Sequence, residues 1–204
     1  MGNDARQSIS DSKVDTATKR IDVIRAAQEL LAEVGYAKTG VREIARRAHV
    51  AVGTIYANFG TGKVGVLQAA LDERVARLVA HVDAATGDDP VDLFLDRARR
   101  LNRELVGDPF LRRIVAERDR VTEPILRDQG HAIAQMFATA AIADLNRLVE
   151  DGAVHCSDPE AVATLVRAAT TGWALWDRAG QTQTDHDRML ETLLSAIRAL
   201  LRTS

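Results

Sequence analysis

The hydrophobic positions of this chain recur every three or four residues along nearly its whole length, which is the spacing of amphipathic helices. Between residues 20 and 63 this spacing predicts three short helices. Gly35 is expected to end the first, because glycine readily takes the left-handed conformation of a helix C-terminus. Thr39 is expected to cap the second. A tight turn at residues 49–51 joins the second and third helices, which predicts a helix-turn-helix.

The same periodicity continues to the end of the chain and predicts six further helices. Breaks rich in Gly, Pro and Asp separate them, and no alternating strand pattern interrupts them. We therefore expect an all-α fold of about nine helices. The later helices are predicted over residues 63–85, 91–106, 110–120, 122–151 (with a kink at Gly130), 158–179 and 185–202.

Three parts of the chain differ in composition and pattern. Residues 1–15 are polar and aperiodic, which favours a disordered arm, although Lys13, Lys19 and Arg20 would allow contacts with a DNA minor groove or with phosphates. Residues 16–66 hold the predicted helix-turn-helix, and residues 67–204 form a larger helical domain.

The third predicted helix has an unusual surface for a basic region. It carries no Lys or Arg, and its outward positions are small or hydroxylated. Gly53 costs a helix about 1 kcal/mol relative to alanine, a cost that close backbone approach to a DNA groove would offset. Thr54 and Tyr56 can donate hydrogen bonds to phosphates or touch base edges.

Charge is distributed unevenly along the chain. The net charge is -2, but residues 16–66 hold eight Lys or Arg against four acidic residues, a net +4 that leaves -6 for the remainder. A basic head on an acidic body is expected when only the head meets nucleic acid.

Residues 20–67 resemble the N-terminal DNA-binding domain of TetR-type transcriptional repressors. The matching positions are Ile24, Ala26, Ala27, Leu30, Leu31, Gly35, Tyr36, Thr39, Val41, Ile44, Ala45, Ala48, Val50, Gly53, Thr54, Tyr56, Phe59 and Lys63. The sequence departs from the family pattern at Gly40, where Ser or Thr is usual, at His49, where Gly is usual, and at Ala51, where a capping Ser is usual. The segment 59–63 is also one residue longer than usual.

The resemblance implies a homodimer that binds a pseudo-palindromic operator. Phosphate contacts are expected from Lys38, Thr39, Arg42, Arg46, Tyr56 and Lys63, and base contacts from Val52, Gly53 and Thr54. The family dimerises through its last two helices, so the interface is predicted at Leu190, Leu193, Leu194, Ile197, Leu200 and Leu201.

The resemblance also implies that a small-molecule inducer enters the helical domain, moves the fourth helix and releases the operator. Large apolar side chains that would line such a pocket are also typical of an ordinary core. They are Phe94, Phe110, Ile114, Met136, Phe137, Trp173 and Trp176.

Other classes of function find little support in the sequence. The five histidines are scattered, the single Cys156 permits neither a disulfide nor a cysteine metal cluster, and no nucleophile motif is present. We expect no enzyme activity, no cofactor and no metal. No segment resembles a signal peptide or a membrane span, which predicts a cytoplasmic protein. A transcriptional activator, a ligand-independent DNA-binding dimer and a helical scaffold without DNA function remain alternatives.

Overall fold

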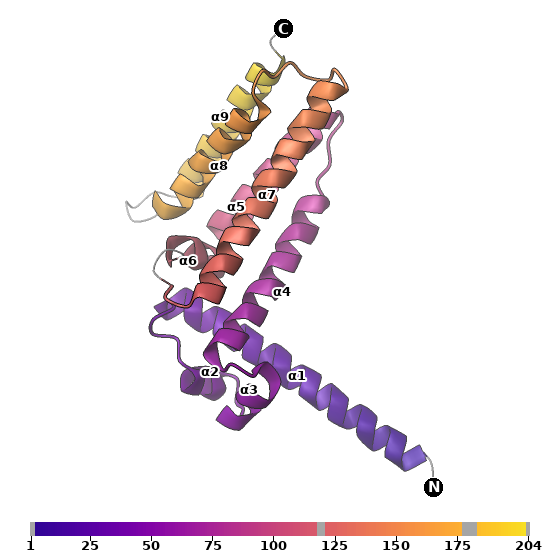
Figure 1. Cartoon of the computed structure of the whole chain (residues 1–204), viewed down its shortest axis with the longest axis vertical. Helices are drawn as coiled ribbons and strands as arrows, with labels where there is room; N and C mark the ends of the chain where they lie inside the picture. Colours follow the sequence, from indigo (N-terminus) through magenta and orange to yellow (C-terminus); the bar gives the residue numbers. More distant parts are fainter. Residues whose placement is uncertain (1–2, 118–120, 177–182, 203–204) are drawn as a thin grey trace. The chain divides into compact units, whose positions relative to one another are not determined.

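The computed structural model describes the backbone of residues 3–117, 121–176 and 183–202, and the side chains of residues 16–117, 121–169 and 185–201. Over these ranges all regular structure is helical, so the predicted all-α fold is confirmed (Figure 1). The nine helices found there are α1 (Asn3–Val34), α2 (Val41–Arg47), α3 (Val52–Phe59), α4 (Lys63–Asp83), α5 (Pro90–Gly107), α6 (Pro109–Glu117), α7 (Pro124–Glu150), α8 (Pro159–Trp176) and α9 (Gln183–Arg202).

The prolines and the residues before them explain where the later helices begin. Each of the four prolines is the first residue of a helix, where its missing N–H is not needed. In α5, α6 and α8 an aspartate precedes the proline and its carboxylate accepts a hydrogen bond from a backbone N–H of the first turn. The acceptors are Asp89, Asp108 and Asp158, with donor–acceptor distances of 2.8, 2.8 and 2.9 Å.

The chain divides into two compact units, Met1–Glu73 and Arg74–Ser204, and the boundary falls within α4. The first unit contains α1, α2, α3 and the start of α4. Its core is formed by side chains that are almost completely buried, including Val23, Ala27, Leu31, Ile44, Ile55, Val66 and Ala70. Gly35 has a φ of 80° directly after α1, as the sequence predicted.

The N-terminal segment differs from its prediction. Helix α1 begins at Asn3, so the backbone of residues 3–15 is helical where a disordered arm was expected. The physical reason is the absence of Gly and Pro between Asn3 and Val34. Extending an anchored helix adds one hydrogen bond for each residue fixed, so no new nucleation cost arises.

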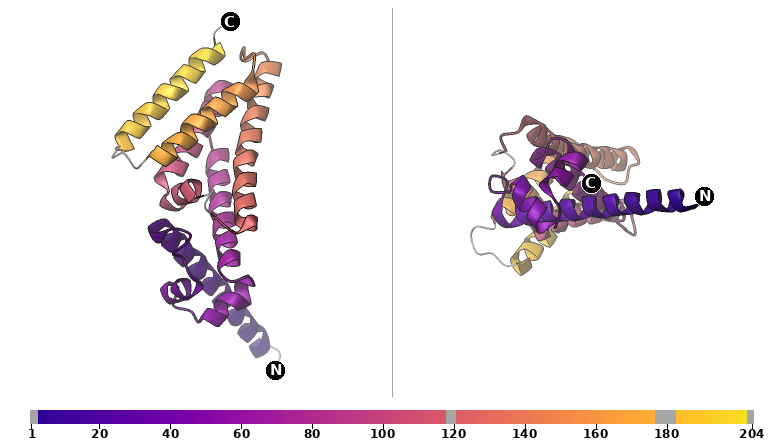
Figure 2. Two further views of the ribbon diagram at one scale, coloured as in Figure 1. Left: turned by 60° about the vertical axis from the view of Figure 1, so that its left-hand side comes forward. Right: turned by 90° about the horizontal axis from the view of Figure 1, so that it is seen from below.

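The second unit is built around one hydrophobic core to which α5, α7, α8 and α9 all contribute. Figure 2 shows α8 and α9 side by side. The buried members are Val91, Phe94, Leu95, Leu145, Leu148, Val154, Ala163, Leu190, Leu194, Ile197 and Leu201.

Most residues of the predicted dimer interface are buried in this core. Four of its six residues, Leu190, Leu194, Ile197 and Leu201, are at most 4% exposed and pack within their own chain. They are spaced by four, three and four residues, so they form one stripe of α9 that the same unit covers. Leu193 is partly buried against that core, whereas Leu200 is 63% exposed.

Candidate nucleic-acid interface

The turn between α2 and α3 is closed by a pair of backbone hydrogen bonds. The N–H of His49 donates to the carbonyl of Arg46 at 3.3 Å, and the N–H of Val50 donates to the carbonyl of Ala45 at 3.0 Å. This pair is the Schellman arrangement of a helix C-terminus. It requires a left-handed residue, and His49 supplies it with a φ of 54°. The family's usual glycine at this position would adopt that conformation without strain.

Helix α3 turns one face to the core and the other to solvent. Ile55 and Phe59 are buried, whereas Val52, Gly53 and Tyr56 are exposed. A Cβ added at Gly53 would meet no atom of the chain within 4 Å. Packing within the chain therefore does not require glycine here, and the open space is available to a partner.

The connection from α3 to α4 is unusually close-packed. Gly60 and Gly62 both have positive φ, a conformation that glycine adopts readily. A Cβ on Gly62 would lie 2.8 Å from Cε1 of Tyr56, and one on Gly65 would lie 2.1 Å from the backbone oxygen of Phe59. The start of α4 thus fixes the end of α3.

The cations on and beside α2 fall into two groups. Arg46 is paired with Glu43 on the same helix, and Arg47 reaches across to Glu33 of α1 at 2.7 and 2.9 Å. Hydrogen bonding to these arginines lowers the pKa of both glutamates. Lys38 and Arg42 are exposed, and neither forms an ion pair with the described side chains.

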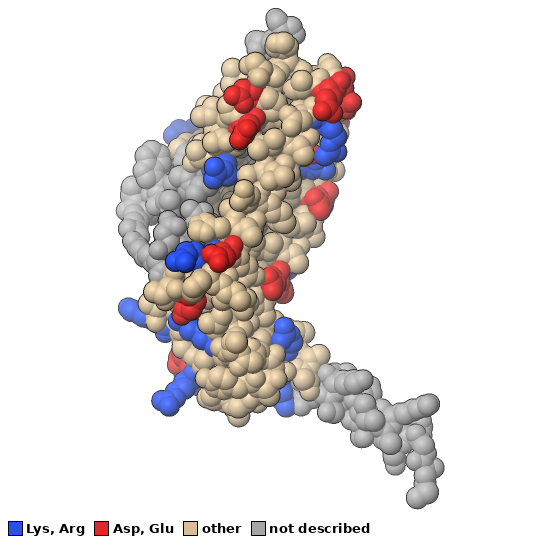
Figure 3. Space-filling model, in the orientation of Figure 1, with Lys and Arg blue, Asp and Glu red and all other residues tan. Residues whose placement is uncertain are grey.

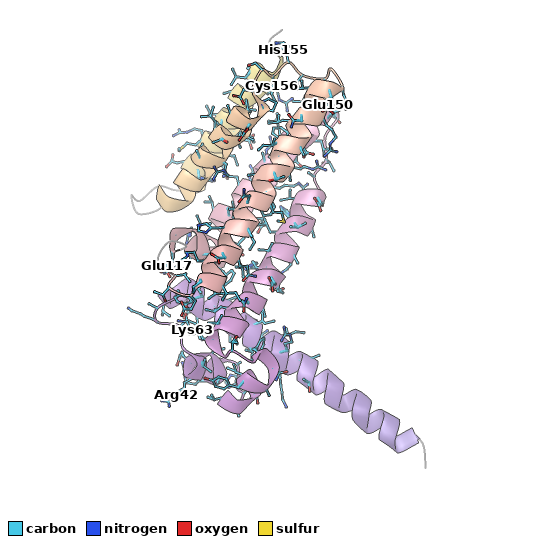
Figure 4. All side chains as sticks on the ribbon, in the orientation of Figure 1. Arg42, Lys63, Glu117, Glu150, His155 and Cys156 are labelled. Carbon is cyan, nitrogen blue, oxygen red and sulfur yellow. The ribbon has the colours of Figure 1, made fainter. Side chains whose placement is uncertain are left out.

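The surface around α3 carries cations, whereas α3 itself has no Lys or Arg. In Figure 3 the blue side chains near α2 and α3 flank a surface of other residues, coloured tan. Arg42 is labelled on α2 in Figure 4. A face without cations that is framed by exposed cations suits a helix that enters a DNA groove between phosphates.

Two predicted phosphate contacts are engaged within the chain. Thr39 is 1% exposed and its hydroxyl donates to the carbonyl of Gly35 at 2.8 Å, so it is unavailable to DNA. It also does not cap α2, because the capping position is Gly40, which has no side chain to accept a hydrogen bond. The Lys63 ammonium (Figure 4) donates to the carbonyl of Tyr36 at 2.7 Å and lies 3.7 Å from the centre of its ring. In this position Lys63 fastens α4 to the connection between α1 and α2.

The side chains of the predicted inducer pocket differ in their exposure. Phe94 belongs to the core and Phe110 is 2% exposed, whereas Met136 is 44% exposed. Ile114 and Phe137 are half-buried. The side chains of Trp173 and Trp176 lie outside the described residues.

A buried polar pair joins α5 to α9 in the second unit. Nε2 of His186 lies 2.8 Å from Oδ1 of Asn102, and the two residues are 7% and 1% exposed. The amide oxygen can only accept, so Nε2 donates. His186 is thus buried although it lies in the first turn of α9.

The burial of His186 predicts an acid-sensitive second unit. Burial lowers the pKa of His186 from its ordinary value of 6.5. As the pH falls through that value the unfolded chain binds the proton first, so the free energy of unfolding should decrease. Urea unfolding at about pH 7.5 and about pH 5.5 would measure the decrease. A His186→Gln variant, which keeps a donor for Asn102, should lose much of it. An equal decrease in both proteins would contradict this assignment.

The described residues contain no group of three or more His, Cys, Asp and Glu side chains that could hold a metal ion. None of the helices in the described part of the chain is both long and apolar enough to cross a membrane. In the connection between α7 and α8, labelled in Figure 4, His155 is exposed while Cys156 packs partly against the core.

Known proteins resemble this chain in sequence and in fold. Residues 23–70 match the model of a family described as bacterial regulatory proteins, tetR family. The chain is 33% identical over 134 residues to the HTH-type transcriptional repressor KstR of Mycobacterium tuberculosis, an alignment that covers 65% of this chain and 55% of KstR. The chain thus spans about half the length of this curated relative.

Two solved structures share the fold over most of the chain. One is a protein of Rhodococcus sp. assigned to the TetR family of transcriptional regulators, with a TM-score of 0.74, 21% identity, and coverage of 88% of this chain and 98% of that one. The other is NalD of Pseudomonas aeruginosa, the secondary repressor of the MexAB-OprM multidrug efflux pump, with a TM-score of 0.69, 23% identity, and coverage of 93% and 98%.

Proposed function

Because the chain carries the N-terminal helix-turn-helix domain of the tetR family, we propose that it is a transcriptional repressor that binds operator DNA through α3. The observation that carries the proposal is the exposed face of α3, which lacks cations and has open space at Gly53. Val52, Gly53 and Thr54 would meet base edges in the major groove, and Tyr56 would reach the backbone. KstR and NalD, which this chain resembles, are both described as repressors.

The phosphate contacts are proposed for Lys38 and Arg42 first, since their charges are not neutralised by carboxylates of the described residues. Arg46 would bind a phosphate only if its guanidinium leaves Glu43 or if the N–H donors not used by Glu43 reach the phosphate. Each phosphate that a cation neutralises releases counterions, so binding weakens steeply with salt. Lys63 is proposed to support this surface from within.

A salt titration separates these roles. With DNA from the gene's own upstream region, wild-type binding should be tight, salt-sensitive and confined to one short palindrome. An Arg42→Ala variant should reduce the slope of log affinity against log salt by about one per bound protomer. Lys63→Ala should lower the thermal stability of the protein and thereby weaken DNA binding, but the slope of log affinity against log salt should stay unchanged. If Lys63→Ala also reduces the slope, Lys63 is a phosphate ligand after all. If the wild-type protein binds no upstream DNA, the proposed function fails.

We propose that the repressor is a homodimer that pairs through exposed faces of α8 and α9. On α8 the exposed residues Ala161, Leu165 and Ala168 follow helical spacing, and Leu165 is 67% exposed. On α9, Ala196, Ala199 and Leu200 are exposed as well. Small residues beside an exposed leucine allow close helix packing, and a two-fold dimer would match two half-sites of a palindrome.

Charge placed in this face should separate the protomers. A Leu165→Glu, Leu200→Glu double variant is expected to run as a folded monomer and to bind the palindrome at least about tenfold more weakly, because each protomer then binds its half-site alone. Sedimentation velocity would measure the mass. Ile125→Glu on α7, where the side chain is 54% exposed, is the matched control and should leave the mass unchanged. A double variant that keeps the wild-type mass would exclude this face.

A small-molecule inducer is proposed to act through the second unit, because α4 runs from that unit into the DNA-binding unit. A ligand that stabilises a different position of α4 would change the spacing of the two α3 helices and weaken operator binding. A gel-shift assay that measures the release of operator DNA when candidate ligands are added would test the proposed inducer. Reporter expression from the bound promoter, with and without the protein, then distinguishes repression from activation.

A further inference from the structure

Three exposed cations of the DNA-binding unit lack a carboxylate partner among the described side chains, and one of them lies on α1. They are Arg20, Lys38 and Arg42. By contrast, Arg25 is held by Asp22 at 2.6 Å, and Arg46 and Arg47 have the glutamate partners described above. We propose that Arg20 has two roles: it positions the recognition helix α3, and it binds a DNA phosphate. The inference rests on the proposed DNA-binding function.

The positioning role follows from two contacts with the end of α3. Nη1 of Arg20 donates to the backbone carbonyl of Asn58 at 3.1 Å, and the guanidinium carbon lies 4.6 Å from the centre of the Phe59 ring. The last carbonyls of a helix have no partner within it, and a positive charge there also complements the helix dipole. Arg20 therefore acts as a C-terminal cap supplied by another helix.

Helix α3 needs such an anchor because its own sequence provides few. It is eight residues long, and Ala51 gives its N-terminus no side-chain cap. Only Ile55 and Phe59 are buried. A helix this short is not stable by itself, so its direction depends on what packs against it. The ring of Phe59 and the carbonyl of Asn58 are both fixed by the same guanidinium.

The phosphate role follows from the donors that remain. A guanidinium has five N–H donors in one plane, and the contact with Asn58 uses one of them. Its planar fork matches two oxygens of a phosphate. The side chain is exposed, and no described carboxylate neutralises its charge. Arg20 on α1 and Arg42 on α2 would then bind phosphates of the DNA backbone near α3, each from a different helix.

A lysine at this position separates the two roles. Lysine keeps the charge but loses the planar fork and the stacking on Phe59, whereas glutamine loses the charge. Binding to DNA from the upstream region would be measured at several salt concentrations for Arg20→Gln and Arg20→Lys, together with thermal unfolding. Arg25→Gln is the matched control, because Arg25 is an exposed arginine on the same helix that is already paired.

The expected result is a loss of about tenfold or more in affinity for Arg20→Gln, as for other hydrogen bonds to charged groups, with a salt slope reduced by about one per bound protomer. Arg20→Lys should restore the slope but not the full affinity, and Arg25→Gln should leave the slope unchanged. An Arg20→Gln variant whose slope equals that of the wild type would overturn the inference while leaving the DNA-binding function intact. Absence of binding by the wild-type protein would instead overturn the function itself.

Discussion

A Gly65→Ala variant is expected to lose stability in the DNA-binding unit and, with it, most operator binding. The added Cβ would lie 2.1 Å from the backbone oxygen of Phe59 and 2.9 Å from the hydroxyl of Thr61. The backbone oxygen of Phe59 cannot move aside as the end of a flexible side chain can. The backbone where α3 joins α4 must therefore shift. Overpacking of this kind typically costs 1–3 kcal/mol, and we expect about 3 kcal/mol here. Thermal unfolding and a DNA titration would measure both effects.

Gly53→Ala is the matched control, because it places the same methyl group where no atom of the chain lies within 4 Å. Alanine favours a helix over glycine, so this variant should gain up to about 1 kcal/mol of stability. It should nevertheless bind the operator more weakly, since the methyl group occupies space proposed for the DNA. If both variants unfold like the wild type, the close junction of α3 and α4 is not what holds the recognition helix.

The features that the sequence predicted well are those encoded locally. Helix boundaries followed from apolar spacing together with Gly35 and the four prolines, because caps and breaks act within a few residues of themselves. The exposed face of α3 was also predicted, since its residue types and its helical register decide it. His49 was visible as a departure from the family pattern, and the structure adds that it takes the left-handed conformation that the turn requires.

Features that depend on contacts between distant residues could not be predicted in this way. A lysine near a DNA-binding helix is expected to bind a phosphate. The ammonium of Lys63 instead donates a hydrogen bond to the carbonyl of Tyr36, which lies 27 positions earlier in the chain. The contact of Arg20 with Asn58 spans 38 positions. The apolar stripe of α9 reads equally well as a dimer face or as core, and its burial depends on residues of α5, α7 and α8 that are distant in the sequence.

In the second unit, the largest expected effect is that of Asp108→Ala. Asp108 is 8% exposed and its carboxylate accepts from the N–H groups of Phe110 and Leu111 at 2.8 and 3.0 Å, which caps α6. The same carboxylate is paired with Arg74 of α4, whose side chain is 25% exposed. Loss of the cap costs about 1 kcal/mol. Removing one partner of a buried pair costs 3–5 kcal/mol, and we expect about 2 kcal/mol because water reaches Arg74. The total is about 3 kcal/mol, measurable by urea unfolding.

Two further variants divide this loss between the cap and the ion pair. Asp158→Ala removes the equivalent Asp-Pro cap at the start of α8, where the aspartate is exposed, and should cost only about 1 kcal/mol. Asp108→Asn keeps an N-cap acceptor but removes the charge, so it should fall between the two. An Asp108→Ala variant no less stable than Asp158→Ala would show that the pair with Arg74 adds nothing. If the pair does stabilise the protein, it ties α6 to the helix that continues into the DNA-binding unit. A ligand that moves α6 would then also move α4 through the ion pair between Asp108 and Arg74.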